Sequence, residues 1–327
     1  MTKFQYLKRL LSFLPMWSKA TGYSVIRLAL AYAVCFIFHG ANSEEFWALR
    51  LYKYNNRERR RILLIRATER FSDCINAGAT AEELACFDEK AHFNAVFADY
   101  IRRDWLYVPD STPEQIRAFL ARTDKFLAKA CVSTQGKNIY LHYSADTDPD
   151  SFLREYEGKP FLLESFITQH PDMAALNPST VNTVRILTMR HGDDVVPLGA
   201  CLRCGGADAY VDNFHSGGVA YPIDLETGVV SGPGRTLLGL DLYIRHPSTG
   251  KVMPGFRIPY WDELLRTVSA AAVIVPHVGF VGWDVAILPD GVALVEGNIN
   301  YPDPIVVQLD EHGVKSTVKD FLKKHGL

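Results

Sequence analysis

Residues 282–298 constrain the fold of this chain more than any other segment, because they read as an apolar β-hairpin that carries acidic side chains. Two β-branched, apolar runs flank Pro289-Asp290-Gly291, which is a strong turn signal. With these three residues as the loop, the register places Asp284 directly opposite Glu296. Side chains alternate between the two faces of a strand, so we expect Asp284, Glu296 and Asn298 on one face.

These three side chains form a candidate site for a divalent cation. Carboxylates directly opposite each other on paired strands repel, and a cation between them removes the repulsion. Mg²⁺ prefers one or two carboxylates with neutral oxygens, which matches Asp284, Glu296 and Asn298. The alternative is that both acids are solvated residues of an edge hairpin. The flanking residues are apolar on both faces, however, which indicates buried strands in which a carboxylate needs a partner.

Charge is divided unevenly along the chain. Its 327 residues, 48% of them hydrophobic, are enough for a large core in one elaborate domain or two. Residues 1–70 hold 13 Lys or Arg against 4 Asp or Glu, a net charge of +9, and the remainder hold 22 against 33, a net of −11. The basic region favours contact with a membrane, a phosphorylated substrate or an acidic polymer. Nucleic acid is not an expected partner, because no recognised binding motif accompanies the charge.

The cysteines indicate a reducing, cytoplasmic setting, because six in a chain of this length are too sparse for a disulfide framework. We interpret Cys201-Leu-Arg-Cys204 as two small packing residues on a strand rather than a zinc or redox motif.

Two N-terminal segments are apolar enough to raise the question of a membrane. The run Leu28–Phe38 is too short to span a bilayer and is expected to be a buried helix. Residues 1–17 mix basic and apolar side chains at near-helical spacing. They either pack on the core or lie on a membrane surface, which would place the protein peripherally at the inner membrane. A secretory signal is not expected, because no convincing cleavage site follows.

The chain changes character near residue 125. Before it, Glu44–Arg70, Thr80–Arg103 and Pro113–Arg122 show helical periodicity. After it, short β-rich runs alternate with turns, which predicts a helical N-terminal part followed by a sheet-rich α+β part. The predicted strands are Phe126–Val132, Asn138–Tyr143, Phe161–Ile167, Thr183–Met189, Val195–Arg203, Val219–Ile223, Val281–Leu288 and Val292–Asn298.

A polar turn containing Gly136 separates the first two of these strands. Backbone N–H groups of such a turn can close over phosphates while Lys129 reaches in from the preceding strand. The spacing is not that of a Walker A loop, and a simple surface hairpin is the alternative.

Arg185 and Arg203 lie inside apolar strand runs, where a permanent positive charge needs an anion. A structural carboxylate would satisfy either one. Two arginines, a lysine and a candidate metal site in one region favour a polyphosphate.

Five ordered motifs together resemble the ATP-grasp superfamily, and more closely its sugar-transfer-associated branch, found among polysaccharide biosynthesis proteins. The likeness runs from about Cys86 to Asn300, with Asp88-Glu-Lys90 as the first lysine motif. In chain order the motifs are Phe126-Leu-Ala-Lys129 with Ser133-Thr-Gln-Gly136-Lys137, Leu163-Glu-Ser-Phe-Ile167, Val181-Asn-Thr-Val-Arg185, Val211-Asp-Asn-Phe-His-Ser-Gly-Gly218, and Gly282-Trp-Asp284 with Glu296-Gly-Asn298.

The resemblance implies an α+β ATP-grasp fold, in which two subdomains clamp ATP. Residues 86–327 would form this domain, and residues 1–85 a helical, basic region ahead of it. Many relatives carry a β-rich substrate domain at that place, so substrate identity does not transfer.

The resemblance also implies the nucleotide contacts. Lys90, Lys129 and the loop at Gly136 would bind the phosphates, with Lys129 also near the adenine ring. Glu164 would accept from the adenine amino group. The backbone of Ser165, Phe166 and Ile167 would contact the edge of the adenine ring. His170 or Asp172 would contact the ribose.

The remaining implied roles concern the chemistry. Arg185 and Arg203 would stabilise the transferring phosphoryl group or an acyl phosphate. Asn213 and His215 would line the phosphate or acceptor side, with His215 either an acid-base group or a hydrogen-bonded loop residue. Asp284, Glu296 and Asn298 would bind Mg²⁺.

The expected function is an ATP- and Mg²⁺-dependent carboxylate-amine ligase that acts through an acyl phosphate. Its substrates would be a small-molecule or sugar-linked carboxylate and an amine, in polysaccharide or secondary-metabolite biosynthesis. Two alternatives use the same site: a kinase that phosphorylates a hydroxyl, and a non-catalytic ATP-binding accessory of glycan assembly.

Overall fold

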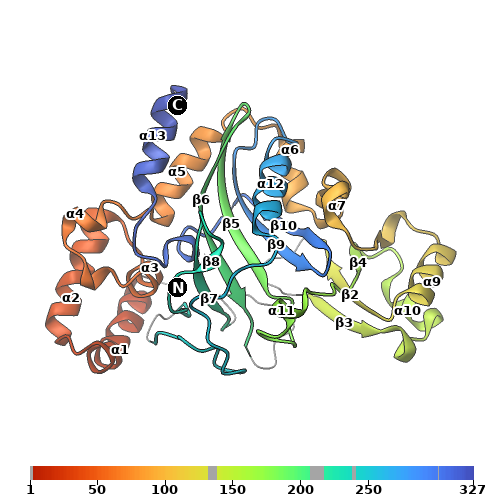
Figure 1. The fold of residues 1–327 in the computed structure, drawn as a ribbon, viewed down its shortest axis with the longest axis horizontal. Helices are drawn as coiled ribbons and strands as arrows, with labels where there is room; N and C mark the ends of the chain where they lie inside the picture. The colour runs from red at the N-terminus through yellow and green to blue at the C-terminus, as the bar shows by residue number, and fades with distance from the viewer. Residues whose placement is uncertain (1–2, 132–137, 207–216, 238–240, 301) are drawn as a thin grey trace.

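The computed structural model describes residues 3–131, 138–206, 217–237, 241–300 and 302–327, with side chains described from Ser12 onward (Figure 1). Figure 1 shows a four-stranded sheet at one end of the molecule, a group of N-terminal helices at the other end, and a six-stranded sheet between them.

The N-terminal region is helical, as predicted, but its helices are short. The helical stretch predicted over Glu44–Arg70 divides into short helices, because the chain restarts a helix twice within it. Asn42 and Asn55 each form a capping box, which satisfies the first N–H groups of a new helix. The elements are α1 (Lys3–Thr21), α2 (Val25–Val34), the π-helix η1 (Cys35–His39), α3 (Ser43–Ala48), the 3₁₀-helix η2 (Leu51–Lys53), α4 (Asn56–Arg59) and α5 (Ile65–Ile75).

Short helices also lead into the small sheet. The predicted helical stretch Thr80–Arg103 divides into α6 (Ala81–Asp88), α7 (Lys90–Val96) and α8 (Ala98–Ile101). The strand β1 (Trp105–Tyr107), which the sequence pattern did not predict, follows directly, and then η3 (Val108–Asp110) and α9 (Pro113–Arg122).

The small sheet is antiparallel, with strand order β1-β4-β2-β3. Its other strands are β2 (Lys125–Ala130), β3 (Ile139–Tyr143) and β4 (Phe161–Ser165), close to the predicted runs. The 3₁₀-helix η4 (Ser144–Asp146) and helix α10 (Pro149–Tyr156) follow β3. A separate core joins this sheet to α9 and α10 through Phe119, Phe126 and Phe152, so the small sheet is a packed unit.

The large sheet is also antiparallel, with strand order β10-β9-β5-β6-β7-β8. The predicted strand runs of this region are confirmed. The elements are α11 (Pro171–Ala174), β5 (Thr183–His191), β6 (Asp194–Cys204), β7 (Val219–Asp224), β8 (Val229–Val230), α12 (Trp261–Ala272), β9 (Phe280–Leu288), β10 (Gly291–Asn298), η6 (Val306–Gln308) and α13 (Lys315–His325).

Helices cover both faces of the large sheet, which explains why its strands are apolar throughout. On one face, Trp283 and its neighbours pack with Phe93 and Phe97 and with α12. On the other face, Leu187 and Phe280 share a core with the N-terminal helices, η6 and α13. Cys201 and Cys204 are fully buried on β6, as expected for packing residues, and none of the six cysteines forms a disulfide.

The turn between β9 and β10 differs from the predicted one. Leu288 pairs with Gly291 rather than Val292, so the loop contains only Pro289-Asp290. Gly291 has a φ of 141°, a conformation that favours glycine over other residues. This shorter loop alone would have moved every later pair by one residue.

A β-bulge restores the predicted pairing farther along the hairpin. Between Leu294 and Glu296 the register shifts by one residue, and Val295 is the extra residue. Glu296 therefore lies opposite Asp284, as predicted, although the path to that register involves a shorter loop and a bulge.

The expectation that Leu28–Phe38 forms a buried helix is wrong for half of its surface. Leu28, Tyr32 and Cys35 are buried, but Leu30 and residues 36–38 are exposed. The sequence pattern could not distinguish these outcomes, because the helix is apolar on all sides.

Candidate functional site

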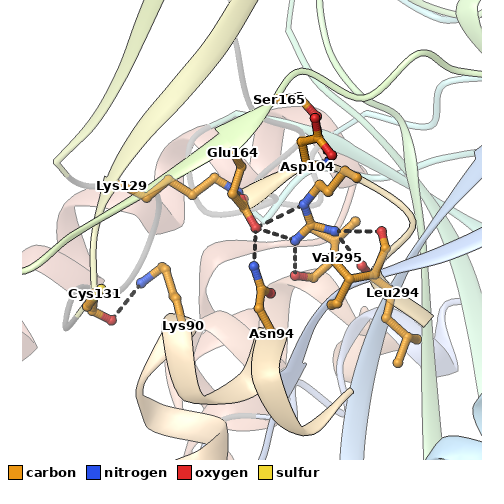
Figure 2. A network of polar contacts seen from close by, with 11 residues as sticks. Lys90, Asn94, Asp104, Lys129, Cys131, Glu164, Ser165, Leu294 and Val295 are labelled. Atoms are coloured by element: carbon orange, nitrogen blue, oxygen red, sulfur yellow. Dashed lines mark hydrogen bonds and ion pairs between the residues drawn. The ribbon is translucent and has the colours of Figure 1, made fainter. Parts of the chain in front are cut away.

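Glu164 of β4 is the centre of the first charged cluster in the candidate site. Its carboxylate, 2% exposed, accepts hydrogen bonds from Arg103 Nε at 2.9 Å, from Asn94 Nδ2 at 2.7 Å and from Lys129 Nζ at 2.5 Å. Figure 2 shows Lys129 and Asn94 approaching Glu164 from β2 and α7. Burial raises the pKa of Glu164, but Arg103 and Lys129 outweigh it and hold the pKa well below its usual range.

Arg103 also connects this cluster to the large sheet. Its Nη1 donates to the Leu294 carbonyl at 2.7 Å, and its Nη2 donates to the Val295 carbonyl at 3.3 Å. Both carbonyls belong to the bulge that sets the position of Glu296. The guanidinium of Arg103 therefore joins Glu164 in β4 to the bulge in β10. The sequence analysis did not identify Arg103 or Asn94 as site residues.

Lys90 lies at the start of α7, within electrostatic reach of both sheets. Burial lowers its pKa, while the charges of Glu296 and Glu164 act in the opposite direction. Its Nζ lies 3.4 Å from the carbonyl of Cys131, the residue that directly follows β2 (Figure 2). The two lysines proposed for phosphate binding, Lys90 and Lys129, are thus brought to one place.

The segment after β4 is held by the small sheet. Ser165 donates its backbone N–H to the Asp104 carbonyl at 2.8 Å, and Phe166 donates to the Lys125 carbonyl at 2.9 Å. The Lys125 ammonium lies 3.6 Å from the centre of the Phe166 ring. These contacts fix the path of the predicted hinge Ser165–Ile167; its contact with an adenine ring stays a prediction.

Asp284 of β9 is the centre of the second cluster. Arg185 donates from Nε to Oδ1 at 2.5 Å and from Nη2 to Oδ2 at 2.9 Å, and Arg203 Nη2 donates to Oδ2 at 2.9 Å. Neighbouring antiparallel strands bring these residues together, because Arg185 pairs directly with Asp284. Burial raises the pKa of Asp284, but both arginines outweigh it, and the pKa lies below its usual range.

Glu296 and Asn298 complete this cluster from β10. Burial and the adjacent Asp284 raise the pKa of Glu296, because a second negative charge there is unfavourable. Asn298 Nδ2 lies 3.3 Å from Glu296 Oε1. The backbone is tight at this point, since a Cβ at Gly282 would meet the Pro302 carbonyl at 2.7 Å.

The donor set fits a hard divalent cation. Two carboxyl groups hydrogen bond to each other, one of them with a raised pKa, and a cation would remove the repulsion that raises it. Within the described ranges, no group of three His, Cys, Asp or Glu could hold a metal, so the set depends on the amide oxygen of Asn298 as third protein ligand.

Other predicted site residues lie apart from these two clusters or outside the described residues. Asp172 is exposed in the first turn of α11, with its carboxylate 3.7 Å from His170 Nδ1. His170 donates its backbone N–H to the Ile287 carbonyl of β9. Gly136, Asn213 and His215 lie outside the described residues, so their roles stay predictions.

A family model described as sugar-transfer-associated ATP-grasp matches residues 112–323. This range contains the residues from Lys129 to Asn298 that form both clusters. Lys90, Asn94 and Arg103 precede it, so their place in the site depends on geometry alone. Among curated proteins, none matches the chain in sequence.

Solved ATP-grasp structures resemble the chain distantly. The ligase PsnB, in complex with a phosphomimetic variant of its minimal precursor, Mg and ADP, is 14% identical; the match covers 80% of this chain and 69% of that protein, with a TM-score of 0.47. Carboxyaminoimidazole ribonucleotide synthase from Aspergillus clavatus, complexed with ATP, is 10% identical over 68% of this chain and 47% of that one, with a TM-score of 0.44.

The D-alanine-D-alanine ligase from Coxiella burnetii is 12% identical, and the match covers 76% of this chain and 63% of that protein, with a TM-score of 0.39. The chain thus spans less than two thirds of two of these three proteins. Their activities and ligands are properties of those proteins.

Proposed function

This chain belongs to the sugar-transfer-associated ATP-grasp family, and from that membership and its two charged clusters we propose that it is an ATP-dependent ligase that joins a carboxylate to an amine. The observation that carries the proposal is the Asp284 cluster: the buried Arg185, the partly buried Arg203 and a second carboxyl group face one carboxylate. Such a cluster suits the transfer of a phosphoryl group, where positive charge must meet phosphate oxygens.

In the proposed reaction, an oxygen of the substrate carboxylate takes the γ-phosphoryl group of ATP, and ADP leaves. The amine nitrogen then attacks the carbon of this acyl phosphate, inorganic phosphate leaves, and an amide forms. Lys90 and Lys129 would bind phosphate oxygens of ATP. Arg185 and Arg203 would donate N–H groups to the transferring phosphoryl group, and the sheet holds both in advance of the reaction.

Asp284, Glu296 and Asn298 would hold Mg²⁺, which when bound offsets negative charge on the phosphate oxygens. The chain's own contribution is to keep Glu296 beside Asp284, through the bulge in β10 and the contact of Arg103 with its carbonyls. No nucleophilic side chain is needed for this chemistry.

The substrate class follows from the family description alone. We propose a small-molecule or sugar-linked carboxylate and an amine, used in polysaccharide or secondary-metabolite biosynthesis in a reducing, cytoplasmic compartment.

The test is ADP release by the purified protein with Mg²⁺ and ATP, against pooled carboxylates and sugar acids with and without pooled amines. We expect ADP only when both an acid and an amine are present. ADP release with hydroxyl compounds alone would instead show a kinase. Tight ATP binding with no turnover in any pool would contradict the ligase and favour the non-catalytic alternative.

Arg203→Gln tests the assigned site in the same assay. Asp284 keeps both bonds from Arg185 in this variant, so the fold should persist. We expect turnover to fall about 100- to 1000-fold, as for other lost donors to transition-state charge. The matched control is Arg190→Gln, since Arg190 lies on the same strand as Arg185 and donates to the carbonyls of Gly192 and Pro276 instead. Equal activity of both variants would contradict the site.

A further inference from the structure

The helix pair at the N-terminus exposes an apolar face. One side of α2 and η1 packs on the core through Leu28, Tyr32 and Cys35, which are at most 7% exposed. Trp17 of α1 anchors the pair further, with its ring stacked 3.9 Å from that of Trp47. The opposite side is exposed, and in the part of the chain that the structure describes nothing covers it. We name it the α2 face: Met16, Val25, Ile26, Leu30, Phe36, Ile37 and Phe38, with exposed fractions from 39% to 75%.

The periodicity shows that this exposure is a continuous stripe. Ile26, Leu30 and Ile37 are spaced by four and seven residues, which places them on one side of a helix. The π-helix then presents Phe36, Ile37 and Phe38 together at its end, before Gly40 terminates it. Contiguous exposed apolar side chains of this kind mark a docking surface in a folded protein.

The segment that carries the α2 face holds positive charge only. Residues 1–43 contain five Lys or Arg and no Asp or Glu. Arg27 lies on α2 itself, with its guanidinium 4.1 Å from the centre of the Tyr23 ring, and Lys19 is exposed on α1. An apolar stripe with aromatic residues and a basic border is the pattern of a helix that lies in a bilayer interface.

Further cations border the other end of the face. His39 Nε2, at the end of η1, lies 3.4 Å from Asn56 Oδ1 of α4, where the exposed Arg57 and Arg60 outnumber the one exposed carboxylate, Glu58. Arg66 is close as well, because a Cβ at Gly40 would lie 3.3 Å from its Cδ. Segments distant in sequence thus add to the same basic border.

The geometry favours lying on a bilayer over crossing it. Among the described residues, no single helix is long and apolar enough to span a membrane; the segments Ser12–Thr21 and Val25–His39 pass together but bend by 110° at their junction. The segment Val25–His39 is about 22 Å long as a helix, whereas a hydrocarbon core is about 30 Å thick. Its buried side is also already occupied by the protein core.

The charge disfavours a second copy of the chain as the occupant. A two-fold interface brings the same surface together from both copies, so the two basic borders would face each other. Residues 1–43 offer no carboxylate to neutralise them. Anionic lipid headgroups would neutralise this basic border.

We propose that the α2 face docks this protein on an anionic bilayer surface, with Ile26, Leu30 and residues 36–38 at the boundary between headgroups and acyl chains. The proposal is independent of the nucleotide chemistry, because Figure 1 places α1 and α2 at the opposite end of the molecule from the small sheet. Docking at this end keeps the small sheet away from the bilayer.

The test is flotation of the full chain with vesicles of phosphatidylcholine alone and of phosphatidylcholine mixed with phosphatidylglycerol. We expect binding to the anionic vesicles that weakens with added salt, and little binding to the neutral ones. The triple variant Phe36→Ser/Ile37→Ser/Phe38→Ser should lower the bound fraction at least tenfold. The matched control is Leu242→Ser/Ile244→Ser/Val252→Ser, which removes three other exposed apolar residues and should bind as the wild type does.

A second variant tests the contribution of basic side chains to vesicle binding. Lys19→Gln/Arg27→Gln should weaken binding to anionic vesicles and reduce its salt dependence, while the circular dichroism spectrum stays unchanged. Equal binding by the wild type and the triple serine variant would overturn the proposal. A second result would also overturn it: the wild type binds no vesicles and sediments as a dimer, and the triple serine variant sediments as a monomer. The α2 face would then join two copies of the chain.

Discussion

The two buried carboxylates of the site, Glu164 and Asp284, each contact two cationic side chains, but the third polar group beside each of them differs. Each lies on an internal strand of its sheet, each is almost inaccessible, and each accepts from two cationic side chains. Beside Glu164 is a neutral amide, that of Asn94. Beside Asp284 is a second carboxyl group, that of Glu296.

This difference separates a cluster that suits an anion from one that suits a cation. Around Glu164 one negative charge meets two positive charges, and the surplus suits an anion such as a phosphate. Around Asp284 the second carboxyl group has a raised pKa, because its ionisation is opposed by the first. The first cluster therefore suits a phosphate, and a cation bound at the second would favour ionisation of Glu296.

The largest expected effect is on stability, from Glu164→Gln. This change leaves the buried Arg103 and Lys129 without a counter-charge, and we expect a loss of about 3–5 kcal/mol in the free energy of unfolding. Urea unfolding measures it. The control is Glu157→Gln, an exposed residue that directly follows α10. A loss below about 1 kcal/mol would contradict the view that Glu164 holds this cluster together.

Glu296→Gln should have the opposite pattern, with activity lost and stability kept. Glutamine retains hydrogen bonding to Asp284 but cannot supply the second negative charge for a metal. We expect Mg²⁺-dependent turnover to fall about 100-fold or more, with metal-free stability unchanged or higher. Asp284→Asn is a poorer probe, because it leaves Arg185 and Arg203 unpaired and mixes unfolding with lost chemistry. Normal Mg²⁺ dependence in Glu296→Gln would show that the metal lies elsewhere.

Arg103→Lys tests whether the two clusters are coupled. Lysine keeps a positive charge beside Glu164 but cannot also donate to the bulge carbonyls of Leu294 and Val295. We expect a loss of about 1–3 kcal/mol in stability and a higher Mg²⁺ concentration for half-maximal turnover. Arg102→Lys is the matched control, since Arg102 pairs with the exposed Asp290. A stability loss with unchanged Mg²⁺ dependence would make Arg103 a structural residue only.

The smallest expected effect is the pH dependence of the free energy of unfolding, and its sign differs between the two clusters. The pKa values of Glu164 and Asp284 are lowered by folding, so their stabilisation is present at neutral pH and is lost as pH falls below about 4. The pKa of Glu296 is raised above its ordinary value of 4.5, so its contribution is lost as pH rises through the folded value.

The measurement is the free energy of unfolding of wild type and Glu296→Gln across pH, without divalent cations. We expect the wild type to lose stability relative to the variant as pH rises above about 4.5, with about 1.4 kcal/mol for each unit by which the pKa is raised. A difference that does not vary with pH would contradict the unfavourable pairing of Glu296 with Asp284.

The hairpin shows how a sequence pattern can predict a contact without its geometry. The facing of Asp284 and Glu296 was predicted with a three-residue loop, and the structure reaches it with a two-residue loop and a bulge at Val295. Alternation of apolar and polar residues is local and gives a strand. The carbonyls of the bulge accept hydrogen bonds from Arg103, which is almost 200 residues away in sequence.

The α2 region shows the opposite case. Its apolar composition predicted a helix, and the structure has one, but burial was predicted wrongly for half of it. An all-apolar helix has no polar side from which to infer which residues face water. Which side packs inward depends on the partners Trp17, Trp47 and Phe46, and these come from other segments.

The amino-acid sequence by itself determined most strands of residues 125–298, the helical N-terminal region and the facing of Asp284 and Glu296, because periodicity and turn chemistry act over a few residues. Only the tertiary structure decided that Arg103 joins Glu164 to the bulge, that Arg185 and Arg203 meet on Asp284, and that the α2 face is exposed. Each of these depends on which distant segments pack together, and buried charges and apolar surfaces are satisfied by partners in space rather than in sequence.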